Sequence, residues 1–147
     1  MRDLVSDVSI VPIIVASLDA DNTPAALDLA GYNSAVVLIG VGVGGITFTG
    51  TNKVEFKLTH SDDNSTYTAV AAADVDIRLP DGTEGSVSSG GIVRSLIAAH
   101  AAATVTRVGY KGNKRYLKLL ADFDGTHAAV TPLGCHLVKS HALTAPA

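Results

Sequence analysis

The sequence predicts an all-β fold, an antiparallel β-sandwich of jelly-roll-like form. Residues 53–60 and 115–123 alternate apolar and polar side chains with the period of two that marks a strand with one buried face. Clusters of Gly, Asp, Asn, Ser and Pro divide the chain into about seven or eight such short segments. Trp is absent and aromatic residues make up only 5% of the chain, a composition suited to thin layers between sheets.

Length and charge limit the possibilities. A chain of 147 residues with a single predicted core is one domain, which buries roughly two thirds of its unfolded surface. The net charge of −3 gives the chain no electrostatic footprint for nucleic acid. The apolar run at residues 35–43 is too short to span a membrane. Acidic residues stand near the start, where a secretory signal would be basic and then apolar. We therefore expect synthesis in a cytoplasm and no membrane partner.

The first 18 residues are expected to form either an edge strand or an extended arm. Residues 8–15 are β-branched and apolar, but Pro12 cannot donate to a ladder. The segment is either an edge strand of the domain, which we favour, or an extended arm that lies on a partner. The predicted organisation is thus an arm or edge strand at 1–18, a β-sandwich domain at 19–139 and an extended tail at 140–147.

The next segments predict strands and a glycine-rich loop. Residues 27–29 form a short strand, and the continuous apolar run at 35–39 indicates a central strand covered on both faces. Residues 40–45 match the dinucleotide pattern G-x-G-x-x-G. That pattern binds a cofactor only where a helix follows, and residues 46–51 are β-branched. We expect a flexible hairpin loop and no cofactor.

The middle of the chain predicts a hairpin, a loop and one helix. Val54, Phe56 and Leu58 face inward from a strand that turns at 61–66 into a second short strand. Residues 71–91 are rich in Ala, Asp, Gly and Ser and predict a long surface loop. Residues 92–101 place apolar side chains at i, i+1, i+4 and i+5, which favours the only short amphipathic helix.

The clearest buried strand follows a basic turn. Residues 104–108 predict a strand, which we expect the turn at 109–114 to join to the strand at 115–123 as a hairpin. A last strand follows at 133–139. The turn carries Lys111, Lys114 and Arg115 between two tyrosines. The composition leaves open whether these residues bind an anionic partner or form a solvated turn.

No catalytic constellation emerges. Cys135 and His136 are adjacent in a strand and point to opposite faces, so Cys135 is best explained as a buried structural residue. The histidines lack a metal-ligand spacing and read as surface or loop residues. Asp62-Asp63 and Asp122-x-Asp124 could hold Ca²⁺, but turn chemistry accounts for both. We expect no enzyme, no metal and no cofactor.

Several segments together resemble a family of small tailed-bacteriophage virion proteins, encoded near the major capsid protein. They are residues 1–4, 27–32, 61–67, 108–117, 138–141 and 145–146. The Gly-Tyr-x-Gly-x-Lys-Arg-Tyr segment within 108–117 is the most specific of them. The resemblance implies a head decoration or cement protein, made in the host bacterial cytoplasm and bound outside the capsid to the major capsid protein and neighbouring copies of itself.

Two alternative roles accompany this expectation. Residues 61–70 and 115–119 are similar to discoidin-like carbohydrate-binding jelly rolls, which suggests a carbohydrate- or host-surface-binding module on the virion. A tail or head–tail connector subunit would share the composition. For capsid docking, we expect contacts from the chain ends and the basic turn, namely Leu4, Val5, Ile10, Val11, Ile13, Lys111, Lys114, Arg115, Leu143 and Pro146.

Overall fold

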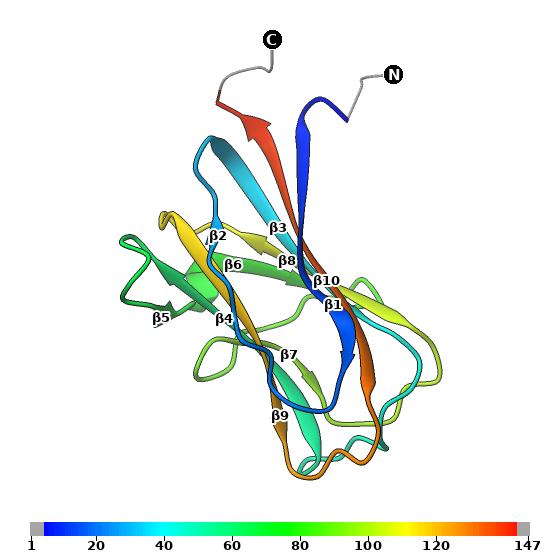
Figure 1. The fold of residues 1–147 in the computed structure, drawn as a ribbon. Helices are drawn as coiled ribbons and strands as arrows, with labels where there is room; N and C mark the ends of the chain where they lie inside the picture. The colour runs from blue at the N-terminus through cyan, green and yellow to red at the C-terminus, as the bar shows by residue number, and fades with distance from the viewer. Residues whose placement is uncertain (1–4, 144–147) are drawn as a thin grey trace.

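The computed structural model describes residues 5–143 and consists of two packed antiparallel sheets (Figure 1). The first sheet, sheet A, has the order β1 (Val8–Leu18), β10 (Thr131–Ala142), β3 (Tyr32–Val41), β8 (Thr104–Tyr110) and β6 (Val75–Arg78). The second, sheet B, has the order β2 (Leu27–Asp28), β9 (Tyr116–Asp124), β4 (Lys53–Ser61) and β5 (Thr68–Ala69), with β7 (Ile92–Leu96) also paired to β4. The predicted β-sandwich is confirmed.

The strand pairs are nested, as in a long hairpin that has been rolled up. The strand β4 pairs with β7, β3 with β8, β2 with β9, and β1 with β10, all antiparallel. Two further pairings, β10 with β3 and β9 with β4, close the roll. This is the connectivity of a jelly roll, in which the nested strands alternate between the sheets. The short strand β5 is an addition that pairs with β4 within sheet B. The strand β6 adds an edge to sheet A beyond β8.

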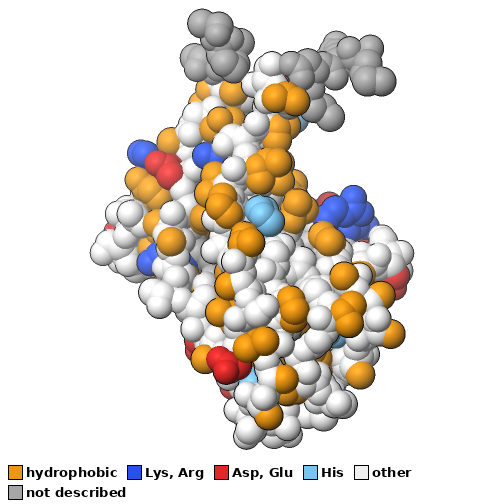
Figure 2. All heavy atoms as spheres, turned by 45° about the vertical axis from the view of Figure 1, so that its right-hand side comes forward, with side chains coloured by type: hydrophobic (Ala, Val, Ile, Leu, Met, Phe, Trp, Pro, Cys, Tyr) orange, Lys and Arg blue, Asp and Glu red, His pale blue; other side chains and the backbone are white. Residues whose placement is uncertain are grey.

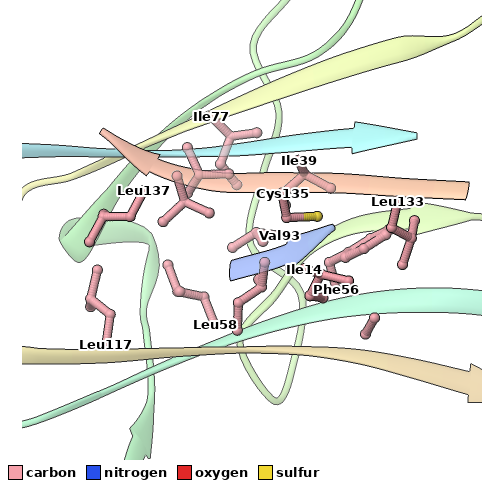
Figure 3. Packing of buried hydrophobic residues seen from close by; sticks show 14 of the residues in the cluster. Ile14, Ile39, Phe56, Leu58, Ile77, Val93, Leu117, Leu133, Cys135 and Leu137 are labelled. Atoms are coloured by element: carbon pink, nitrogen blue, oxygen red, sulfur yellow. The ribbon is translucent and has the colours of Figure 1, made fainter. Parts of the chain in front are cut away.

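The core lies between the sheets and follows the period-two pattern of the central strands (Figure 3). On β4 the side chains of Val54, Phe56 and Leu58 are fully buried, as predicted. On β9 the same is true of Leu117 and Leu119. Sheet A contributes buried side chains from β3, β8 and β10, including Val37, Ile39, Val108, Cys135 and Leu137. The predicted inward faces and the buried structural cysteine are therefore correct.

The predicted hairpin from β8 to β9 is wrong. The two strands belong to different sheets, so the turn at 111–115 crosses the edge of the sandwich. The glycine-rich segment makes the same kind of crossing, because β3 ends at Val41 in sheet A and β4 begins at Lys53 in sheet B. It is therefore an inter-sheet connection, and not the expected hairpin loop. Sequence alternation identifies such strands but does not reveal which sheet each one joins.

The predicted helix at 92–101 is also wrong, and the predicted loop at 71–91 contains structure. Residues 92–96 form β7, whose ladder with β4 shifts register between Phe56 and Lys57. The extra residue of this bulge, Val93, is buried beside Leu96, and this irregularity produced the apparent helical spacing. The supposed loop holds a 3₁₀ turn at Ala72–Asp74 and the edge strand β6.

The segment at the start of the chain is an edge strand. The strand β1 pairs with β10 along its length, from Val8 opposite Ser140 to Leu18 opposite Thr131, with a bulge between Pro12 and Ile14. The strand β10 continues through Ala142, beyond the expected last strand at 133–139. Within the described residues, no helix is long and apolar enough to cross a membrane.

Candidate functional site

A cavity of about 380 Å³ opens at the end of the sandwich where β3 begins and β10 ends. Two segments that are far apart in the sequence form its walls, the β2–β3 turn and the turn at 111–115. The lining residues of this end cavity are Leu29, Ala30, Gly31, Tyr32, Asn33, Ser34, Ala35, Tyr110, Gly112, Asn113, Lys114, Arg115 and Leu143. Two of the segments that carry the virion-protein resemblance therefore meet in space.

A hydrogen-bond network fixes the turn that crosses between the sheets. The amides of Lys111 and Gly112 both donate to the carbonyl of Asp74, at 2.6 and 3.1 Å. The hydroxyl of Tyr110 accepts the Lys114 amide at 3.1 Å and lies 2.9 Å from Nδ1 of His60. His60 is only 6% exposed, so its reading as a surface or loop histidine is wrong. The specific sequence of this segment thus serves the fold.

The basic residues of the turn are largely paired within the chain. Arg115 donates from Nε and Nη2 to both carboxylate oxygens of Asp28, at 2.9 and 2.8 Å. These bonds, with the Ala30 amide, lower the pKa of Asp28 to about 2. Lys114 Nζ lies 3.3 Å from the Thr68 hydroxyl and 4.0 Å from an Asp62 oxygen. Lys111 is exposed. The turn is therefore a weakly charged surface, and only Lys111 is available to an anionic partner.

The expected contact residues at the chain ends fall into three groups. Val5, Ile10 and Leu143 are exposed, and the Leu143 amide donates to the Gly31 carbonyl at 2.9 Å. Val11 and Ile13 instead pack against the core. Leu4 and Pro146 lie outside the described residues.

The outer surface of sheet A is unusually apolar (Figure 2). Outward side chains alternate with buried ones along β10, β3 and β8, the edge strand β1 adds its exposed side chains, and cross-strand pairing sets them side by side. We define the apolar face by these residues: Val8, Ile10, Pro12, Val15, Val36, Leu38, Val105, Pro132 and Val138, around His136 and the glycines Gly40 and Gly134. Figure 2 looks onto this side, where hydrophobic side chains gather and charged ones lie near the margins.

The apolar face is open within the described chain. Ile10, Val15 and Val105 are 62%, 66% and 52% exposed. A Cβ atom at Gly134 would meet nothing within 4 Å, whereas one at Gly40 would lie 2.5 Å from the Gly134 carbonyl oxygen. Glycine at position 40 therefore lets β3 and β10 approach closely, and no side chain projects from the surface at this point. The central strand β3 is thus covered on one face only, and the prediction of cover on both faces is wrong for this chain alone.

The outer surface of sheet B has the opposite character. Its central strands present Lys53, Glu55 and Lys57 from β4, and Lys118 and Asp122 from β9. Four of these groups form ion pairs, from Lys53 Nζ to Glu55 at 2.6 Å and from Lys57 to Asp122. The fifth, Lys118, places its ammonium group 4.2 Å from the centre of the Tyr67 ring. A sheet that faces water shows such a polar outer face. The two outer surfaces therefore differ in polarity, and sheet A carries the apolar one.

Neither the cysteine nor the acidic clusters form a reactive centre. Burial raises the pKa of the Cys135 thiol to about 12. Ligand oxygens of Glu55, Asp122 and Asp124 lie within 4.8 Å of one another. However, the ammonium groups of Lys53 and Lys57 already occupy this cluster. Asp63 accepts the amides of Ser65 and Thr66 at 2.8 Å each, as expected of a turn residue.

Comparisons with protein-family models, curated proteins and solved structures found no match to this chain. The function must therefore be argued from the two surface features, the end cavity and the apolar face. The end cavity is bordered by groups that already bond to one another. The apolar face is the less usual of the two for a surface in contact with water, because contiguous exposed apolar patches mark interaction sites. The signal for it in the sequence is the apolar run at 35–39, which predicts a strand covered on both faces.

Proposed function

We propose that this protein is a non-enzymatic bacteriophage capsid decoration protein that binds the assembled shell in many copies through its apolar face. The observation that carries the proposal is the uncovered outer surface of β3, where Val36 and Leu38 stand among exposed apolar side chains. An apolar central strand gains its burial from a second layer. In the described chain that layer is missing, so a partner protein supplies it.

The resemblance to virion proteins supports the capsid shell as that partner. A protein that binds the assembled shell, and not free coat subunits, stabilises the shell by RT ln(1 + [L]/Kd) per site. Burial of apolar surface contributes about 25 cal/mol for each Å² removed from water. Repetition over many sites multiplies the effect, so each contact need not be tight.

The test compares two leucines that occupy equivalent places on the two sheets. Leu38 lies on the outer side of β3, and Leu120 on the outer side of β9, each in a central strand and each half-buried. Purified wild type, Leu38→Gln and Leu120→Gln are mixed with expanded, undecorated capsids and with free coat subunits, and then pelleted. We expect the wild type and Leu120→Gln to pellet with capsids, and Leu38→Gln to remain in the supernatant.

The competing roles give different results. Failure of the wild type to pellet with capsids would exclude the decoration role. A connector would occupy one unique position on the particle, whereas a decoration protein recurs over the whole head, as imaging of labelled virions would reveal. Binding on a glycan array that Leu38→Gln leaves intact would instead favour the carbohydrate-binding alternative.

A further inference from the structure

Arg107 occupies an unexpected position at the margin of the apolar face. It projects outward from β8, directly opposite Leu38 of β3 on one side and Arg78 of β6 on the other. Its side chain is exposed and forms no hydrogen bond or ion pair with any residue between 5 and 143. The remainder of the cross-strand row consists of Pro12 and His136. Arg107 is therefore an unpaired cation beside an uncharged surface.

The neighbouring arginine does not supply Arg107 with a partner. Arg78 has its own acceptors, since its guanidinium lies 2.9 Å from Glu84 and 3.6 Å from Asp76. Like charges directly opposite each other on adjacent strands are destabilising. An uncharged residue at position 107 would relieve that repulsion and continue the apolar row. Within residues 5–143, Arg107 thus has no acceptor of its own, because the two nearby carboxylates pair with Arg78.

We infer that the partner surface presents a carboxylate that pairs with Arg107 when the apolar face docks. This inference rests on the proposed function and names the chemistry of the partner: an apolar patch bordered by an Asp or Glu side chain. The guanidinium fork matches a carboxylate with two parallel hydrogen bonds. Docking removes water around the pair, which strengthens the attraction. The apolar contact supplies affinity, and the ion pair fixes the orientation.

The experiment measures the affinity for expanded capsids of wild type, Arg107→Ala and Arg107→Lys. The matched control is Lys118→Ala, which removes a cation from the outer side of β9 on sheet B. We expect Arg107→Ala to weaken binding about 10- to 100-fold, because hydrogen bonds to charged groups contribute about 1.5–3 kcal/mol and 1.4 kcal/mol is tenfold. Arg107→Lys keeps the charge and loses the fork, so it falls between. Lys118→Ala binds as the wild type does.

Two further measurements distinguish an ion pair with the partner from a structural role of Arg107 within the fold. Denaturant unfolding of Arg107→Ala is expected to show no loss of stability, which excludes a merely structural role. High salt is expected to weaken wild-type binding more than that of Arg107→Ala, because the ion pair is screened.

Three results would overturn the inference, and they can be told apart. Wild-type affinity in Arg107→Ala, with binding lost in Leu38→Gln, contradicts the carboxylate and leaves the decoration role standing. No capsid binding by the wild type removes both proposals. A dimer of the free protein that dissociates in both Arg107→Ala and Leu38→Gln assigns the apolar face to a second copy of this chain.

Discussion

The hydroxyl of Tyr110 and Nδ1 of His60, which lie 2.9 Å apart, join the two sheets at the end of the sandwich. Tyr110 belongs to β8 of sheet A, and His60 to β4 of sheet B. The hydroxyl accepts the Lys114 amide and can donate to the imidazole, which places the ring proton of neutral His60 on Nε2. In that tautomer, Nε2 is directed toward Asp74, whose carboxylate oxygen lies 4.0 Å away.

Loss of the Tyr110 hydroxyl should therefore destabilise the fold. In Tyr110→Phe, the buried imidazole and the Lys114 amide both lose a partner, and we expect a loss of about 1–3 kcal/mol in the free energy of unfolding. Denaturant unfolding measures this loss. Tyr116→Phe is the control, because Tyr116 lies on the outer side of β9 and should change stability by less than about 0.5 kcal/mol. Equal stability of the two variants would contradict this account of the network.

Stability should also depend on pH through His60. Burial lowers the pKa of His60 below its usual value and outweighs the opposing effect of Asp74. The unfolded chain therefore takes up the proton first as the pH falls. The contribution of neutral His60 to the free energy of unfolding is complete above a pH of about 7. It is lost as the pH falls below about 6.5 toward the pKa of His60 in the folded protein.

Unfolding measured across this range checks the effect. We expect His60→Gln to be less stable than the wild type at neutral pH and to depend less on pH between about 7 and 5. NMR titration of the His60 ring provides a direct readout. A midpoint above the usual histidine value would contradict the role of burial.

The sequence predicted the parts of this site better than their arrangement. Alternation identified β4 and β9 because each has one fully buried face. It did not place His60, because the histidine continues the inward face of β4 past Leu58 and looks like any polar residue at a strand end. Nor could it show that Tyr110 and His60 meet, since their contact depends on a crossing between sheets. The end cavity was missed for the same reason.

The sequence pattern of the apolar face predicts the strand correctly but not its surroundings. The run at 35–39 does belong to a central strand, but sequence gives no information on whether the second face is covered by the same chain. Arg107 alternates with the buried Thr106 and Val108, as any solvent-facing residue would. Only the register of β8 with β3 and β6 places it between Leu38 and Arg78.

Calcium should not stabilise the wild-type protein. The carboxylates of Glu55, Asp122 and Asp124 lie close enough for a metal, but Lys53 and Lys57 already pair with them. We expect the melting temperature of the wild type to be the same with Ca²⁺ and with chelator. A Lys53→Met, Lys57→Met variant should be less stable in chelator and regain stability with Ca²⁺, because three carboxylates then lack cations. A rise in the wild-type melting temperature would contradict occupation by lysine.

Cys135 should be unreactive until the protein unfolds. The thiolate is the nucleophile, and burial raises the pKa of this thiol to about 12. In mildly alkaline buffer, a thiol-specific reagent should label the native protein only after denaturant is added. The exposed variant Ser17→Cys provides the control and should react with one equivalent at once. Fast labelling of the native wild type would show that sheet A opens at β10.

Substitutions at two isoleucines of β1 should affect folding and docking separately. Ile14 is 5% exposed and belongs to the core, whereas Ile10 is 62% exposed on the apolar face. Ile14→Ala should cost about 2–5 kcal/mol of unfolding free energy, because it leaves a cavity. Ile10→Ala should change stability by less than about 0.5 kcal/mol and weaken capsid binding. If β1 were instead an arm that orders only on a partner, Ile14→Ala would leave the stability of the free protein unchanged. Denaturant unfolding and capsid pelleting of the same two variants therefore test the fold and the proposed docking surface independently.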